Sequence, residues 1–105
     1  MQVQVHTDAN IEGREGLIAH VTGVVEHRLA RFRTRITRVE VHIGDEGGHK
    51  TGPTEKRCMM EARIDGHQPV AVTQHEGSVH QAVDGAAEKL LRALESTFGR
   101  LDDRR

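Results

Sequence analysis

The chain has 105 residues, of which 15 are basic and 16 acidic, so its formal net charge is −1 with histidine neutral. This length predicts one domain, spanning 1–105, with a single core. The balanced charge lacks the global signature of a nucleic-acid-binding protein. Two phenylalanines, with no tryptophan or tyrosine, exclude base stacking on aromatic platforms as the main binding mode.

Composition also indicates the compartment. The single cysteine excludes an internal disulfide framework and suits a reducing environment. No apolar run reaches the roughly 18 residues of a membrane span, and the first residues lack a charged-then-apolar signal. We therefore expect a cytoplasmic protein that does not contact a membrane.

The first half of the chain predicts a strand, a helix and a second strand. Gln2–His6 alternates polar and apolar residues, as a half-buried strand does. From Leu17 to Phe32, apolar residues recur at the spacing of one helix face. Arg38–Ile43 alternates again and predicts the second strand.

The second half predicts a hairpin, a further strand and a long helix. Four glycines and a proline in 44–54 indicate a polar loop at a hairpin tip, followed by a strand at Lys56–Ile64. Asp65-Gly66 is a tight-turn signal before a last strand at about Val70–Gln74. Ser78–Leu101 has the periodicity of an amphipathic helix, and 102–105 is expected to fray.

The order β-α-β-β-β-α predicts the architecture. The first βαβ unit requires a parallel pair of strands, and the following strands can form an antiparallel meander. Because the strands alternate, one sheet face is buried and the other solvated. We expect an α/β two-layer sandwich, a four-stranded mixed sheet with two helices on one face. The predicted core includes Val39, Val41, Met60, Val83, Leu90 and Leu94.

The polar side of the final helix is sorted by charge. One flank carries the acids Asp84, Glu88 and Glu95. The other carries the bases Lys89, Arg92 and Arg100. A basic flank offers a track for phosphates, and Gly85 and Ser96 within it would let a nucleic-acid backbone come close. The alternative is an ordinary solvated face with accidental sorting.

A second basic cluster follows His27. It contains five arginines without an acid, namely Arg28, Arg31, Arg33, Arg35 and Arg38. The functional interpretation is phosphate contact, because guanidinium forks match phosphate oxygens in pairs. The structural alternative is that cations at a helix end complement the helix dipole, with Arg28 lying along the apolar stripe and Arg38 pairing with a neighbouring glutamate.

The sequence shows no recognisable catalytic constellation. Eight histidines are present, but no pair has strong metal-ligand spacing. Cys58 alternates inward with Met60, which predicts a buried structural thiol rather than a nucleophile. We therefore expect no enzyme activity, no metal, no cofactor and no small-molecule substrate.

Three stretches resemble one family. They are Asn10-Ile11-Glu12 followed by Leu17; Leu29, Phe32 and Arg35-Ile36; and Ala82-Val83-Asp84-Gly85 followed by Glu88-Lys89-Leu90 and Arg92. The last resembles the signature Ala-Ile-Asp-x-x-x-Asp/Asn-Lys-Leu-x-Arg of the ribosome hibernation-promoting factor and ribosome-associated inhibitor family, also called sigma-54 modulation proteins. Element order agrees over essentially the whole chain.

The resemblance implies a regulator that binds the small ribosomal subunit, blocks the path of messenger and transfer RNA, and inhibits translation under stress or in stationary phase. It implies a monomer when free, with RNA contacts from basic side chains. The candidates are Lys89, Arg92, Arg100, His27, Arg28, Arg31, Arg35 and Arg38. The alternative is a protein-interaction module of the same fold that has lost ribosome binding. The near-neutral charge, the acidic flank and the run Glu95–Gly99, where the family usually has lysines, favour that alternative.

Overall fold

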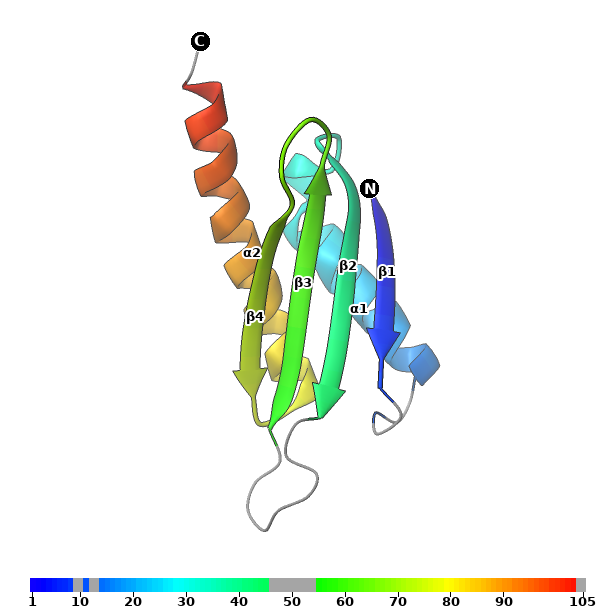
Figure 1. Ribbon diagram of the computed structural model, residues 1–105. Helices are drawn as coiled ribbons and strands as arrows, with labels where there is room; N and C mark the ends of the chain where they lie inside the picture. Colours follow the sequence, from blue (N-terminus) through cyan, green and yellow to red (C-terminus); the bar gives the residue numbers. More distant parts are fainter. Residues whose placement is uncertain (9–10, 12–13, 46–54, 104–105) are drawn as a thin grey trace.

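The computed structural model describes residues 1–8, 11, 14–45 and 55–103. Along the chain lie β1 (Gln2–Thr7), α1 (Arg14–Arg28), the 3₁₀ helix η1 (Ala30–Phe32), β2 (Ile36–Asp45), β3 (Lys56–Ile64), β4 (Val70–Glu76) and α2 (Val79–Asp102) (Figure 1). The predicted order is confirmed. Most of the predicted 44–54 loop, the motif residues Asn10 and Glu12, and 104–105 lie outside the described residues.

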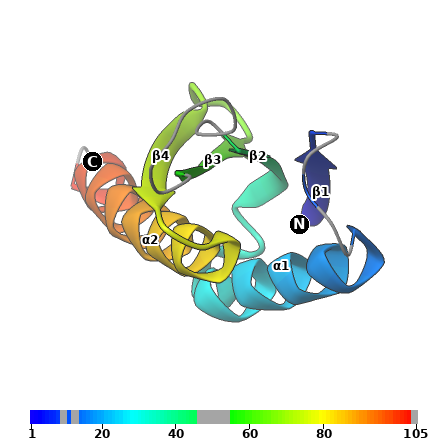
Figure 2. The same cartoon turned by 90° about the horizontal axis from the view of Figure 1, so that it is seen from below.

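The four strands form one sheet in the order β1-β2-β3-β4. β1 runs parallel to β2, and the other two pairs are antiparallel, as predicted. The register places Val5, Val41, Met60 and Val72 in one row across the sheet. Both helices cover the face on which this row lies, and the other face stays open (Figure 2). The predicted two-layer sandwich is therefore confirmed.

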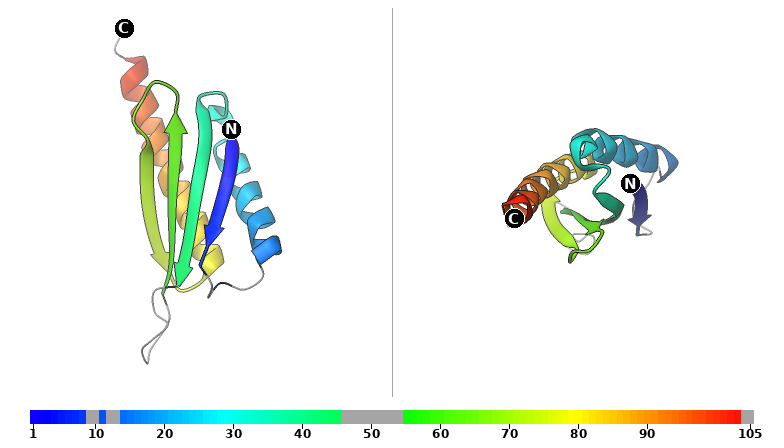
Figure 3. Two further views of the ribbon diagram at one scale, coloured as in Figure 1. Left: turned by 45° about the vertical axis from the view of Figure 1, so that its right-hand side comes forward. Right: turned by 90° about the horizontal axis from the view of Figure 1, so that it is seen from above.

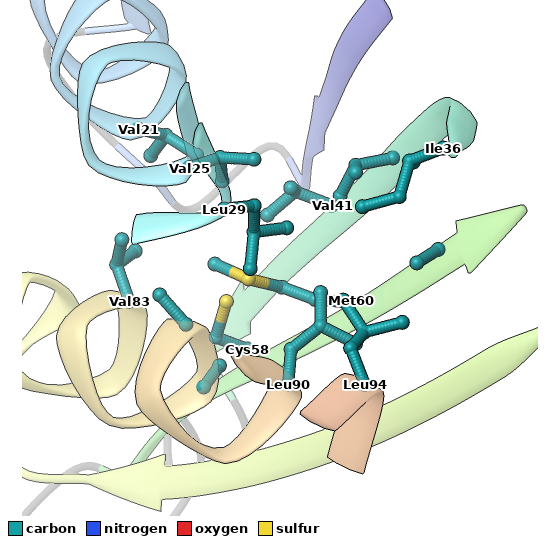
Figure 4. Packing of buried hydrophobic residues seen from close by; sticks show 14 of the residues in the cluster. Val21, Val25, Leu29, Ile36, Val41, Cys58, Met60, Val83, Leu90 and Leu94 are labelled. Carbon is teal, nitrogen blue, oxygen red and sulfur yellow. The ribbon is translucent and has the colours of Figure 1, made fainter. Parts of the chain in front are cut away.

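The core lies between the sheet and the two helices (Figure 4). All six residues predicted for it have no exposed surface. Leu29 and Val25 contribute from the α1 side, so the core is continuous under both helices. No helix in the described ranges has the length and apolar character to cross a membrane.

The first helix differs from its prediction at both ends. It begins at Arg14, three residues before Leu17. The sequence pattern did not predict this first turn, because its residues are exposed and lack apolar periodicity. It ends at Arg28 rather than Phe32, and η1 follows, with Phe32 N–H donating to the Leu29 carbonyl at 2.9 Å. The apolar step from Leu29 to Phe32 is three residues, which suits a 3₁₀ turn as well as an α-helix.

The predicted ends of the other helix and of the strands agree with the structure within a few residues. Ser78 caps α2, its hydroxyl accepting the Gln81 N–H at 3.2 Å. The Asp65-Gly66 turn is confirmed, and Gly66 has φ +74°, a conformation that favours glycine. α2 continues past the turn that joins β3 and β4 (Figure 3, left). The predicted fraying at 102 is wrong, because Asp102 is still part of α2.

Truncation of Leu90 tests the packing of α2. Leu90 is fully buried, so Leu90→Ala should lower the free energy of unfolding by about 2–5 kcal/mol, measured by urea denaturation. Ile18→Ala is the matched control, because Ile18 is an exposed aliphatic residue on α1, and it should lose clearly less stability. Equal losses in the two variants would contradict the described core.

Cys58 gives a test that depends on pH. Burial raises the pKa of the Cys58 thiol from 9.0 to about 12, so the folded protein should resist alkylation at about pH 8, whereas urea-unfolded chain should react readily. Above pH 9.0 the unfolded chain releases the thiol proton and the folded chain keeps it. Stability should therefore fall as pH rises from 9.0 towards 12, and this component should be missing in Cys58→Ala. Similar alkylation rates in both states would refute the burial.

Candidate functional site

The polar edges of α1, η1 and α2 meet along a line of ion pairs. Three pairs cross it, namely Arg28–Glu88, Arg31–Glu95 and Arg35–Asp102. Their nitrogen–oxygen distances are 2.6, 2.9 and 3.1 Å. We call these three pairs the arginine–acid seam. Three of the five arginines in the predicted cluster thus face acids of α2 rather than open solvent.

The seam follows from residue spacing. Glu88, Glu95 and Asp102 recur every seven residues, which is about two helical turns, so they lie along one edge of α2. Arg28 ends α1, and the 3₁₀ turn then carries Arg31 along the same edge. The sequence prediction did not include Asp102 in the acidic flank. The 100° helical step that grouped the other two acids would have found it.

Two aromatic rings support the seam. Phe32 and Phe98, in a chain without tyrosine or tryptophan, contact each other with ring centres 4.8 Å apart. The Arg31 guanidinium lies 4.5 Å from the centre of Phe32, and that of Arg35 lies 3.9 Å from the centre of Phe98. Each of these arginines is therefore oriented by a ring face as well as by a carboxylate. A cation–π contact of this kind contributes about 0.5–1 kcal/mol at an exposed site.

The seam contributes little to stability despite its geometry. Its arginine side chains are 34–65% exposed and its acids 41–54%. Exposed ion pairs contribute about 0–1 kcal/mol each, because water screens them and long side chains must be ordered. Breaking a seam pair therefore costs the folded protein little free energy.

The basic flank of α2 also has partners within the chain. Lys89 Nζ donates to the Thr73 carbonyl at 2.8 Å, on the edge strand β4, where a lysine discourages pairing with another strand. Arg100 donates to the Ser96 hydroxyl at 2.6 Å. Arg92, whose side chain is 75% exposed, pairs with Glu88 at 2.9 Å. Glu88 thus bonds both Arg28 and Arg92. The acids and bases of α2 therefore contact each other and are not separated as strictly as the two predicted flanks imply.

Gly85 has a structural role that the sequence prediction did not identify. A Cβ built on Gly85 would lie 2.8 Å from Cγ of Gln74, a residue of β4. The small residue therefore permits close packing of α2 on the sheet. The predicted approach of a nucleic-acid backbone at Gly85 is wrong, because the Gln74 side chain occupies that position.

The structure separates one candidate from the rest. Arg38 lies on the open face of the sheet, where its Nη2 pairs with Glu40 Oε2 at 2.8 Å. This confirms the pairing alternative for Arg38. The other seven candidates lie on the helices and the turn after α1, with His27 exposed beside Arg28. One flat surface cannot include Arg38 and the helix edges.

A single group among the described residues has metal-ligand geometry. It consists of His6, Glu40 and His42, on the open face of the sheet. The spacing of histidines in the sequence predicted no metal site, because His6 and His42 are far apart in the chain and only the strand register brings them together.

Comparison with known proteins agrees with this architecture. A ribosomal subunit interface protein from Coxiella burnetii has a similar structure, with a TM-score of 0.69 and 14% identity over 94% of this chain and 99% of that chain. The N-terminal domain of Protein Y from Thermus thermophilus gives a TM-score of 0.68 and 18% identity, over 92% of this chain and 99% of that chain. These identities establish a shared fold only. No curated protein matches the chain significantly.

The sequence itself establishes the family. The profile of the family described as "Sigma 54 modulation protein / S30EA ribosomal protein" matches residues 3–102, which is nearly the whole chain. The chain therefore belongs to the sigma-54 modulation protein / S30EA ribosomal protein family.

Proposed function

We propose that the protein binds the small ribosomal subunit through basic side chains of α1, η1 and α2 and blocks the path of messenger and transfer RNA. It would thereby inhibit translation under stress or in stationary phase. The observation that carries this proposal is family membership over residues 3–102. The mechanism is steric and electrostatic, with no bond made or broken. The protein acts in the cytoplasm, on ribosomal RNA, and is a monomer when free.

Two rows of bases form the proposed contact surface. One row is Lys89, Arg92 and Arg100 on α2. The other is His27, Arg31 and Arg35, at the end of α1 and in the turns that follow. Six of these seven side chains, counting Arg28 of the seam, already hold an oxygen partner within the chain. Binding to RNA would therefore proceed by exchange of partners.

Such an exchange costs the protein little. Each exposed seam pair contributes about 0–1 kcal/mol, and phosphate contacts release counterions from the RNA, which favours binding. The seam acids would remain near the RNA, however, and would repel phosphates. The expected result is weaker binding than a fully basic surface would give, with a steep dependence on salt.

One observation favours the alternative, a protein-interaction module without ribosome affinity. The seam neutralises three arginines, and Glu88 additionally pairs with Arg92. A protein surface with alternating charges would complement such a surface better than a uniform row of phosphates would.

Reversal of charge on α2 tests the proposal. Arg92→Glu should reduce binding to small subunits about tenfold or more, because it removes a charge-assisted contact and adds repulsion. Co-sedimentation is the measurement. Wild-type affinity should also fall by about 100–500-fold between about 50 and about 200 mM salt if about five phosphates are contacted.

The matched control is Arg14→Glu, which makes the same change of charge at the exposed start of α1, far from the seam. It should change affinity far less. Equal losses in both variants would indicate a general charge effect and exclude the proposed surface. No co-sedimentation of wild-type protein, even at low salt, would exclude ribosome binding and favour the interaction module.

Neutralising the seam acids should have the opposite effect. Glu95→Gln with Asp102→Asn should strengthen subunit binding several-fold, because two arginines lose their internal partners and two repulsive charges disappear. Urea denaturation should show a loss of at most about 1 kcal/mol per pair. The control is Glu15→Gln with Glu55→Gln, two exposed acids away from the seam. Tighter binding by both double variants alike would contradict a specific role of the seam.

A further inference from the structure

The open face of the sheet carries a group of side chains that lies outside the proposed RNA-contact surface. We propose that His6, Glu40 and His42 form a binding site for a divalent transition-metal ion of the zinc class. The site lies on the sheet face opposite the two helices, so the inference is independent of the proposed function.

The strand register assembles the group. His6 of β1 and His42 of β2 are direct partners in the parallel pair. Glu40 precedes His42 by two residues, so both side chains point to the same face of β2. His6 Nε2 lies 3.9 Å from Glu40 Oε1, and His42 Nε2 lies 3.7 Å from the same oxygen. The three candidate ligand atoms all lie within 4.8 Å of one another.

These distances are close to those of a zinc site. Ligand bonds of about 2.0–2.1 Å in a tetrahedron put ligand atoms about 3.3 Å apart. The two histidine–glutamate distances therefore need to shorten by roughly half an ångström. The two histidine nitrogens, which lie within 4.8 Å of each other, need to approach by up to about 1.5 Å. The imidazoles are stacked, with ring centres 4.6 Å apart and planes inclined by 15°. Both rings must turn so that their lone pairs converge, and their side chains, 51% and 40% exposed, have space to do so.

The Glu40 carboxylate directs one oxygen to the histidines and the other to arginines. Glu40 Oε1 faces the two histidines, while Glu40 Oε2 bonds Arg38 at 2.8 Å and lies 3.7 Å from Arg63. Such outer contacts fix a ligand and commonly change metal affinity by about 10–100-fold. Arg63 also pairs with Glu61, so two arginines and two glutamates balance in charge around the site.

The ligand types determine the class of ion. Two imidazole nitrogens with one carboxylate suit zinc and its neighbours, whereas magnesium and calcium prefer oxygen ligands throughout. Both imidazoles are partly exposed, so water can serve as a fourth ligand. A hollow lies beside the two imidazoles, although Glu40 does not line it. Its lining is His6, Thr7, Asp8, His42, Ile43, Gly44 and Arg57. A bound ion would cross-link the edge strand β1 to its neighbour β2.

Titration with zinc chloride, followed by calorimetry on the full chain, tests the site. Wild-type protein should bind one zinc ion, and an excess of magnesium should not compete. His42→Gln and Glu40→Gln should each weaken zinc binding at least tenfold, because each removes a ligand. Zinc should also raise the melting temperature of wild-type protein but not of His42→Gln, since an ion that binds only the folded state stabilises it.

The chain provides a matched control in a second histidine pair. His20 and His80 have ring centres 4.3 Å apart but do not belong to a group of three ligands among the described residues. His20→Gln with His80→Gln should keep wild-type zinc affinity. Cobalt(II) gives a further readout, because an intense visible absorption should accompany a tetrahedral site and vanish in His6→Gln. Unchanged zinc affinity in His42→Gln and Glu40→Gln, or zinc binding lost only in the control, would overturn the proposal.

Discussion

Burial of only one face of the sheet is the constraint on which the other features depend. The row Val5, Val41, Met60 and Val72 must be covered, and a sheet of this width needs both helices on that face. With both helices on one surface, a polar edge of each lies beside the other, and here these edges carry the arginine–acid seam. The same constraint leaves the opposite face in water, where polar side chains of adjacent strands lie next to each other, as His6 and His42 do.

Periodicity was sufficient to predict the layers, the strand order and the core, because each depends on which face of an element is apolar. Cys58 and Leu90 were assigned to the interior for that reason, and both are buried. The end of α1 was not predictable in this way. The spacing from Leu29 to Phe32 is the same for the last turn of an α-helix and for η1, and the direction in which the chain enters β2 decides between them.

The functional surface was only half predictable. Sequence spacing identified an acidic flank on α2 and an arginine cluster after α1, but not that the two face each other. That contact depends on how the helices pack, and periodicity contains no information about the pairing of one helix edge with another. The group His6, Glu40 and His42 was missed for a related reason, since a parallel register is fixed by a crossover rather than by a local turn.

The seam also bears on how the protein can change over evolutionary time. Its acids lie on the solvent side of α2, away from Leu90 and Leu94, which hold the helix on the sheet. A single substitution at Glu95 or Asp102 changes the surface charge by one or two units and leaves every core contact in place. Selection can therefore adjust the strength of an electrostatic interaction in small steps, without passing through unstable intermediates. The residues that hold α2 on the sheet thus differ from the acids that set its surface charge, so this charge can diverge while the architecture is kept.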